Sequence, residues 1–369
     1  MDLSTSRAFE NYFHHVLQKA VECGSSDVHV EPFPGMFQIK FRVDGVLRVF
    51  DRQILDNKRI ERFAEVTRKI CGFDMGKDGK PLDARFCVPL LPYDFRSSLC
   101  PTMHGEKIVL RLLQKNKTFD LQTYPLRDDA KSDLLRAINR SQGMILVSGP
   151  TGSGKTTLLY NALSAIDRIA NNVHSIEDPI EYSLPNLGQT QISHGVLSFA
   201  EVLRSLMRQD PDVILVGEIR DEETARAAIH ASCTGHLVLS TVHANSASEI
   251  VERMEGLGVN RDLFLANLAF ASAQRLVSKN CSFCSEEDPD SVALVRAVFE
   301  EDIVPKQGKG CEHCGNSGVK GMVLLFEWMT RERDNLGKKI IKNHDSIRNQ
   351  SKYYMQEGVI NAQNACGTD

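Results

Sequence analysis

Residues 144–157 read MILVSGPTGSGKTT and contain the pattern G-x-x-x-x-G-K-[ST] from Gly149 to Thr156. An apolar run precedes the pattern, and we expect a helix over 155–169 to follow it. Between a strand and a helix, such a loop turns its backbone N–H groups and the helix dipole toward phosphate groups. The alternative is a glycine-rich turn that binds nothing, and the flanking strand and helix argue against it. We therefore predict a phosphate-binding loop made of Gly149, Pro150, Thr151, Gly152, Ser153, Gly154, Lys155, Thr156 and Thr157.

Strands and helices are predicted to alternate around this loop. The apolar and amphipathic runs predict strands over 144–148, 173–177, 213–217 and 237–241, and helices over 155–169, 198–209 and 222–232. Capping boxes begin at Ser198 and at Ser246, each with a glutamate three residues later. The order favours an α/β fold with a mainly parallel sheet that is covered on both faces.

Acidic residues follow two of these strands. Glu218 ends the apolar run 213–217, where a carboxylate can hold Mg²⁺ directly or through water beside the phosphate loop. Glu177 ends the run 173–176, and a carboxylate there can orient or deprotonate an attacking water. Many buried strands end in an exposed acid without function, but a position downstream of a phosphate loop favours the catalytic interpretation. In the same scheme Lys155 reaches the β- and γ-phosphates and Thr156 ligates Mg²⁺.

Histidines and arginines add further candidates. His236 and His243 bracket the strand 237–241, where a histidine can bond the γ-phosphate or merely satisfy nearby backbone groups. Arg204 and Arg208 lie one helical turn apart, so they form surface ion pairs or stabilise transferring phosphate charge.

Two CxxC pairs, Cys281/Cys284 and Cys311/Cys314, stand 26 residues apart among ten cysteines. Four thiolates at this spacing can hold one tetrahedral Zn²⁺ with no open position, which predicts a structural site. Four unligated thiols and an iron–sulfur cluster are the competing interpretations.

The chain has 369 residues and a formal net charge of −4, and no apolar run approaches the length of a membrane span. Its first residues lack a secretory signal, so we expect a cytoplasmic protein that a partner holds at any membrane.

The motifs in this order resemble those of the secretion ATPases that power type II secretion, type IV pilus assembly and competence pseudopili. The resemblance includes the upstream segments Ser26–Glu31, Phe41–Gly45 and Arg96–Arg111. It implies a PAS-like α/β domain over 1–113 and a RecA-like P-loop ATPase domain over 129–280, and the polar residues 114–128, with one proline and no clear period, are predicted to form the linker between them. A tetracysteine zinc module over 281–318 and a C-terminal segment over 319–369 follow.

The resemblance also implies roles for single residues. The ligands are ATP, Mg²⁺ and Zn²⁺, with Glu177 as the leading candidate to polarise water and Glu218 as the Walker B acid. The histidines 236 and 243 match the family's His box. Arg96 and Arg111 match arginines of the first domain that are expected to reach a neighbouring site. Further arginines match positions near the phosphates: Arg204, Arg208 and Arg220.

The resemblance further implies that the chain works as a homo-hexamer that drives an inner-membrane platform protein. The cysteine module favours pilus or pseudopilus assembly or type II secretion over pilus retraction. A nucleotide-binding regulator and a nucleic-acid translocase are two further functions that the same core could serve. The negative net charge and the position of Trp328 beyond the ATPase core argue against nucleic acid as a partner.

Overall fold

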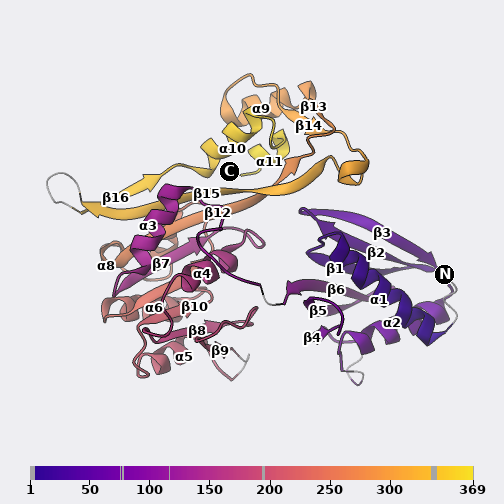
Figure 1. Cartoon of the computed structure of the whole chain (residues 1–369), viewed down its shortest axis with the longest axis horizontal. Helices are drawn as coiled ribbons and strands as arrows, with labels where there is room; N and C mark the ends of the chain where they lie inside the picture. The colour runs from indigo at the N-terminus through magenta and orange to yellow at the C-terminus, as the bar shows by residue number, and fades with distance from the viewer. Residues whose placement is uncertain are drawn as a thin grey trace. The chain divides into compact units, whose positions relative to one another are not determined.

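Two units follow one another along the chain, Met1–Lys117 and Thr118–Asp369 (Figure 1). The computed structural model describes residues 5–74, 76, 79–115, 117–192, 196–333 and 339–368. Each unit has a sheet and a core of its own, so each is described by itself.

The first unit is an antiparallel sheet of six strands with two helices. The strands are β1 (Asp27–Phe33), β2 (Met36–Val43), β3 (Val46–Ile54), β4 (Leu82–Cys87), β5 (Tyr93–Thr102) and β6 (Gly105–Gln114), in the order β3-β2-β1-β6-β5-β4. The helices are α1 (Ser6–Glu22) and α2 (Asn57–Ile70). The strands β2 and β3 form a hairpin around Asp44-Gly45, and both residues of that turn have positive φ, as a tight hairpin turn requires.

Alternation along the strands gives this sheet one apolar and one charged face. Phe9, Phe13 and Leu17 of α1 share a core with Val28 and Leu110 of the sheet. The residues that alternate with the core positions carry charge on the other face: Asp27, Glu31, Lys40, Arg42, Lys107 and Arg111. The charged face is therefore held together by ion pairs between neighbouring strands.

The second unit has an eight-stranded sheet in the order β16-β15-β12-β7-β11-β10-β8-β9. Its strands are β7 (Gly143–Ser148), β8 (Val173–Glu177), β9 (Gly188–Gln191), β10 (Val213–Val216), β11 (Leu237–Val242), β12 (Leu268–Asn280), β15 (Val319–Arg333) and β16 (Lys339–His344). Five neighbouring pairs are parallel, and only β12–β15 and β15–β16 are antiparallel among the described strands of this sheet. The predicted mainly parallel sheet is confirmed.

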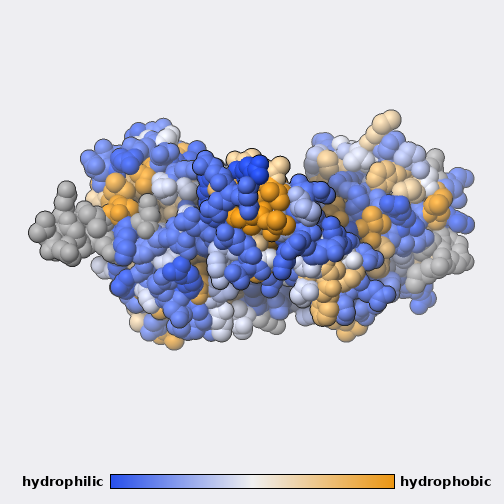
Figure 2. Space-filling model, turned by 90° about the horizontal axis from the view of Figure 1, so that it is seen from above, coloured by the Kyte–Doolittle hydropathy of each residue, from blue (hydrophilic) through white to orange (hydrophobic). Residues whose placement is uncertain are grey.

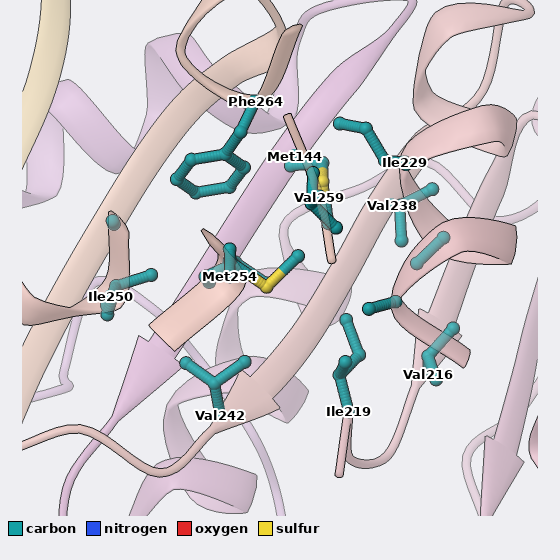
Figure 3. Close-up of a cluster of buried hydrophobic side chains, with 14 of the residues drawn as sticks. Met144, Val216, Ile219, Ile229, Val238, Val242, Ile250, Met254, Val259 and Phe264 are labelled. Atoms are coloured by element: carbon teal, nitrogen blue, oxygen red, sulfur yellow. The ribbon is translucent and has the colours of Figure 1, made fainter. Parts of the chain in front are cut away.

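Helices cover both faces of this sheet, as the sequence predicts. One core lies under α5 (Phe199–Leu206), α6 (Glu222–Cys233), α7 (Glu249–Gly256) and α8 (Arg261–Asn267). In it, Met254 and Phe264 lie in one cluster with Met144 and Val238 of the sheet (Figure 3). The other core lies under α3 (Asp128–Ile138) and α4 (Lys155–Ser164).

Three helices differ from their predicted bounds. The helix predicted over 198–209 begins at Phe199, after the Ser198 cap, and ends at Leu206. The helix after the phosphate loop ends at Ser164 rather than 169, because Asp167 accepts the N–H groups of Ile169 and Ala170 and so competes with helical bonding. The helix predicted from Ser246 begins at Glu249 instead. The N–H of Glu249 donates to the hydroxyl of Ser246 at 3.2 Å, so Ser246 lies in a turn that precedes the helix.

The C-terminal part folds onto one end of the long strands β12 and β15. It contains β13 (Ser285–Glu287), a 3-10 turn over Pro289–Ser291, α9 (Val292–Phe299), β14 (Lys306–Gly308), a second turn over Glu312–Cys314, α10 (Ile347–Gln356) and α11 (Ala362–Cys366). Val295 and Phe299 of α9 share a small core with Met355, Ile360 and Ala365. The segment between the cysteine pairs is therefore packed against the end of the chain.

Trp328, the chain's one tryptophan, ties β15 to its surroundings. Its indole N–H donates to the buried Asp133 of α3 at 2.9 Å. Its ring stacks on His344 of β16 with centroids 4.9 Å apart, and the Arg127 guanidinium lies 5.5 Å from the ring centre. These contacts fix β15 and β16 against the start of the second unit.

The visible face in Figure 2 is mostly hydrophilic, with apolar residues in small groups. Among the helices of the described residues, none is both long enough and apolar enough to cross a membrane.

Candidate functional site

The phosphate loop joins β7 to α4 at the carboxyl edge of the parallel sheet. Gly149 and Gly154 have φ of 136° and 87°, which favours glycine at both positions. A Cβ on Gly149 would lie 2.2 Å from the carbonyl oxygen of Gln274 on β12. The loop therefore needs glycine for its backbone conformation and for its close approach to the neighbouring strand.

Lys155 begins α4 and bends back over the loop. Its ammonium donates to the carbonyl oxygens of Gly149 at 2.7 Å and Pro150 at 3.0 Å. Burial lowers the pKa of Lys155, and the Glu218 carboxylate partly offsets this effect. The ammonium thus lies at the loop, within electrostatic range of an acid from a different strand, and Thr156 follows it on the first turn of α4.

Glu218 follows β10 and is held by two basic side chains. Its Oε1 lies 3.1 Å from Nε2 of His243, which follows β11, and also pairs with Nε of Arg220. Burial by itself raises the pKa of this carboxyl, but Arg220 and His243 together bring it below its usual value. The side chain is 19% exposed, so an ionised carboxylate at this edge remains accessible.

Glu177 ends β8 in a different environment, because it is almost fully buried. Its carboxylate accepts the hydroxyl of Ser175 at 2.5 Å, the amide of Gln189 at 3.1 Å and the hydroxyl of Tyr160 on α4. No sequence motif identifies Tyr160 or Gln189 as part of the site. Tyr160 lies within the predicted helix over 155–169, whereas Gln189 lies on β9, a strand that is not predicted from the sequence.

His236 is not brought to this edge. It precedes β11, so it lies at the opposite end of that strand from His243, about 20 Å away at the usual rise per residue. Its Nδ1 lies 2.9 Å from the carbonyl oxygen of Ala231. This placement favours the interpretation in which His236 satisfies local backbone groups.

Arg204 and Arg208 lie on the exposed side of α5 and just beyond its end. Arg204 pairs with Glu223 of α6 at 2.8 Å, and Arg208 donates to the carbonyl oxygen of Arg204 at 3.0 Å. Both arginines are therefore engaged with α5 and α6 rather than with the phosphate loop. Arg220, in contrast, lies at the site through its pair with Glu218.

In the first unit, Arg96 and Arg111 lie directly opposite each other on β5 and β6. Both alternate with core residues, so both belong to the charged face of that sheet. The Nε of Arg111 pairs with Asp27 at 3.1 Å, and its side chain is 53% exposed. Two adjacent cations on one face form a place where an anion would relieve their repulsion.

A hollow of about 470 Å³ opens beside the phosphate loop. It is lined by Gly149, Pro150, His243, Ala244, Asn245, Glu249, Glu252 and Arg253. Asn245 donates its backbone N–H to Glu249 at 2.9 Å, which fixes the segment after His243. The loop, the histidine and the start of α7 therefore enclose one space.

The four predicted cysteine ligands come together. Their sulfur atoms all lie within 4.8 Å of one another, with Sγ–Sγ distances of 3.8 Å for Cys281–Cys311, 3.9 Å for Cys284–Cys314 and 3.8 Å for Cys311–Cys314. A tetrahedron of sulfur about 2.3 Å from Zn²⁺ has edges of about 3.8 Å, so this donor set fits zinc.

Backbone N–H groups support the sulfur atoms. Gly310 donates to Cys284, and Cys311 and Gly318 donate to Cys314, at 3.2–3.3 Å. Burial raises the pKa of the Cys314 thiol, but the N–H groups of Cys311 and Gly318, together with the neighbouring Cys311 and Cys284 thiols, bring it down to about 6. The cluster therefore favours the thiolate form at this cysteine.

Comparisons with known proteins agree on one family. The family described as "Type II/IV secretion system protein" matches residues 2–366. A putative type II secretion system protein E of Escherichia coli (strain K12) is 39% identical over 93% of the chain. The type IV pilus assembly ATPase PilB of Myxococcus xanthus (strain DK1622) is 38% identical over 85% of it. The chain spans 72% of the first relative and 57% of the second.

Among solved structures, the pilus retraction motor PilT with bound ADP has a similar fold. The TM-score is 0.63 with 22% identity, and the alignment covers 96% of each chain. At this identity the likeness extends to the fold alone.

Proposed function

Because the chain belongs to the type II/IV secretion system protein family, we propose that it is an ATPase motor for type II secretion or for pilus or pseudopilus assembly. The proposal rests on the residues that meet at the carboxyl edge of the parallel sheet. There the phosphate loop, Lys155 and the Glu218–His243 pair lie at the ends of adjoining parallel strands. Catalysis of phosphoryl transfer consists largely of positioning and charge stabilisation, which this arrangement provides.

The loop from Gly149 to Thr157 would hold the phosphates of ATP through its N–H groups, with Lys155 on the β- and γ-phosphates. Thr156 and, through water, Glu218 would hold Mg²⁺, which neutralises developing negative charge when bound. Glu177 would polarise the attacking water, with Tyr160, Ser175 and Gln189 fixing its carboxylate. His243 and Arg220 would orient Glu218.

We further propose that the working form is a cytoplasmic homo-hexamer that docks on a membrane platform protein. The pair Arg96 and Arg111 supports this assembly, because two adjacent cations on an open sheet face suit the phosphates of a neighbouring protomer's nucleotide. Under this proposal, ATP hydrolysis in the ring moves the platform protein.

The cysteine cluster favours the assembly or secretion branch over pilus retraction. The sulfur positions fit Zn²⁺ held by Cys281, Cys284, Cys311 and Cys314, and no open position remains for catalysis. The curated relatives with 38–39% identity carry secretion and pilus assembly names, whereas the likeness to the retraction motor is one of fold.

Mg-ATP hydrolysis by the purified chain tests the proposal across a range of protomer concentrations, with Lys155→Ala as the control. We expect activity per protomer to rise with concentration and to be absent in the control. Activity that stays constant with concentration would contradict the role of Arg96 and Arg111 at a neighbouring site. No hydrolysis at any concentration would favour the nucleotide-binding regulator.

A further inference from the structure

A phosphate loop works only when its N–H groups face the phosphates, so its carbonyl groups must be held away from them. In this loop the carbonyl oxygens of Gly149 and Pro150 accept from Lys155. The carbonyl oxygen of Ser153 has a different donor, because it accepts Nε2 of Gln274 at 2.5 Å. Gln274 comes from β12, 121 residues farther along the chain than Ser153.

Gln274 is held rigidly at this position. It is fully buried and lies between two neighbouring strands, with Ala273 beside Ser148 of β7 and Gln274 itself beside Phe326 of β15. The residues before it on β12 are buried and are mostly apolar. An amide at such a position costs free energy unless it is bonded. The Gln274 amide donates to the phosphate loop and also contacts the Tyr124 hydroxyl.

The loop touches Gln274 at both of its ends. A Cβ on Gly149 would collide with the Gln274 carbonyl oxygen at 2.2 Å, and a Cβ on Gly154 would lie 3.2 Å from its Nε2. Oε1 of Gln274 and Oγ of Ser153 are both buried and have no hydrogen-bond partner within the described residues. The loop therefore approaches Gln274 closely at two places, at its backbone carbonyl oxygen and at its side-chain amide.

We propose that Gln274 is a positioning residue for nucleotide binding, which turns the Ser153 carbonyl away from the phosphates and so keeps the loop ready to bind them. This inference rests on the proposed function. Without the amide donor, the carbonyl oxygen can turn toward the bound phosphates and repel them. The effect belongs to nucleotide affinity, since Gln274 bonds the loop backbone and not a reacting atom.

Gln274→Met tests the inference, because methionine keeps the length of the side chain and removes the donor. Gln350→Met is the matched control, since Gln350 also bonds backbone groups, those of Phe326 on β15. Titration with a fluorescent ADP analogue is expected to show about tenfold weaker binding for Gln274→Met, which corresponds to about 1.4 kcal/mol. Gln350→Met is expected to bind within about twofold of the wild type, since it leaves the loop untouched.

Gln274→Glu separates the donated bond from packing. The introduced carboxylate accepts only and opposes the Ser153 carbonyl, whereas its protonated form can donate to it. Burial raises the pKa of such a carboxyl, so protonation is within reach of mildly acidic solution. The ratio of dissociation constants, variant to wild type, is therefore expected to fall as the pH is lowered from about 8 to about 6.

Binding by Gln274→Met that equals binding by Gln350→Met would overturn the inference. Weak binding by both Gln274 variants with a ratio that is constant with pH would assign the effect to packing and would also overturn it. If the wild type binds no better than Lys155→Ala, the proposed function itself fails, and the inference fails with it.

Discussion

The two acids at the sheet edge differ in what surrounds them. Glu218 is partly exposed beside two basic groups, whereas Glu177 is buried and accepts three hydrogen bonds. A carboxylate fixed by several donors keeps one orientation, which is what positioning a water requires. The same bonds make Glu177 part of the packing between α4, β8 and β9.

Glu177→Gln separates these roles. The amide has nearly the shape of the carboxylate but cannot take a proton, so kcat for ATP is expected to fall by about 10²- to 10⁴-fold. Nucleotide affinity and the thermal midpoint are expected to stay close to those of the wild type, as measured by titration and calorimetry. Tyr160→Phe serves as the comparison, since it removes one bond and leaves the carboxylate. A large fall in the midpoint with little change in kcat would show that Glu177 is structural.

The charge of Lys155 depends on Glu218. Burial lowers the pKa of Lys155, and the carboxylate of Glu218 raises it. Glu218→Gln removes the raising contribution, so the pKa of Lys155 falls further. Because phosphates bind the ammonium form, ADP affinity is expected to decline at a lower pH in the variant than in the wild type.

Isothermal titrations with ADP from about pH 7 up to about pH 10, which approaches the usual pKa of lysine from below, would measure the difference. Glu222→Gln, which removes an exposed acid paired with Arg226, is the control. If ADP affinity declines at the same alkaline pH in the wild type and in Glu218→Gln, the influence of Glu218 on the pKa of Lys155 is contradicted.

Among single residues, the sequence predicts those whose neighbours are close in the chain. Lys155 and Thr156 follow from one local motif, and Glu218 follows from a strand that ends in an acid. Gln274 and Tyr160 act across the fold, so no local pattern indicates them. His236 shows the converse, because its motif suggests the site but the direction of β11 places it at the other edge.

At the scale of elements, the buried Glu327 of β15 joins two helix starts. It accepts the N–H of Ala247 at 2.5 Å, just before α7, and the N–H of Ile347 at 3.0 Å, at the start of α10. Ile347 is the first residue of α10, where the N–H groups have no partner within the helix, and a carboxylate suits the positive dipole ends of both helices. One carboxylate thus fixes both the segment after His243 and the start of α10.

Glu327→Ala is expected to lower the free energy of unfolding by about 3 kcal/mol, because two buried charge-assisted bonds are lost. Glu327→Gln keeps an acceptor oxygen, so its free energy of unfolding is expected to fall by less. Urea unfolding measures both, with the exposed Glu301→Ala expected to change stability by less than about 1 kcal/mol. Equal stability of Glu327→Ala and Glu301→Ala would contradict the double cap.

The alternating strands and helices between 143 and 256 could be predicted because each buries a regular apolar pattern. The long strands β12 and β15 are harder to predict. Met322–Phe326 is recognisable as a strand, but its pairing with 274–278 spans the cysteine segment. Such a pairing depends on contacts far apart in the sequence, and no turn signal connects the two runs.

At the scale of the whole molecule, removal of the metal is expected to unfold the cysteine module and the part packed on it, and to leave the rest of the chain folded. Treatment with a chelator, or Cys284→Ser, should unfold 281–318, since the segment depends on its four sulfur ligands. The helices α10 and α11 should lose protection too, because they share a core with α9. The first unit and nucleotide binding should be retained, since the phosphate loop is held by β7, α4 and β12.

Hydrogen exchange followed by mass spectrometry, together with an ADP titration, would measure both expectations. Cys87→Ser is the control, because Cys87 is an exposed thiol of the first unit. If ADP binding is lost together with the protection of 281–318, the expectation that nucleotide binding does not depend on the cysteine module is contradicted.

The contacts of Trp328 have an optical consequence. Because the chain has one tryptophan, all indole emission under selective excitation comes from β15. The ring stacks on His344 and lies near Arg127, whose place in the chain is just before α3. Quantum yield and emission wavelength therefore record the state of this junction alone, and the protein carries a spectroscopic label that needs no engineering.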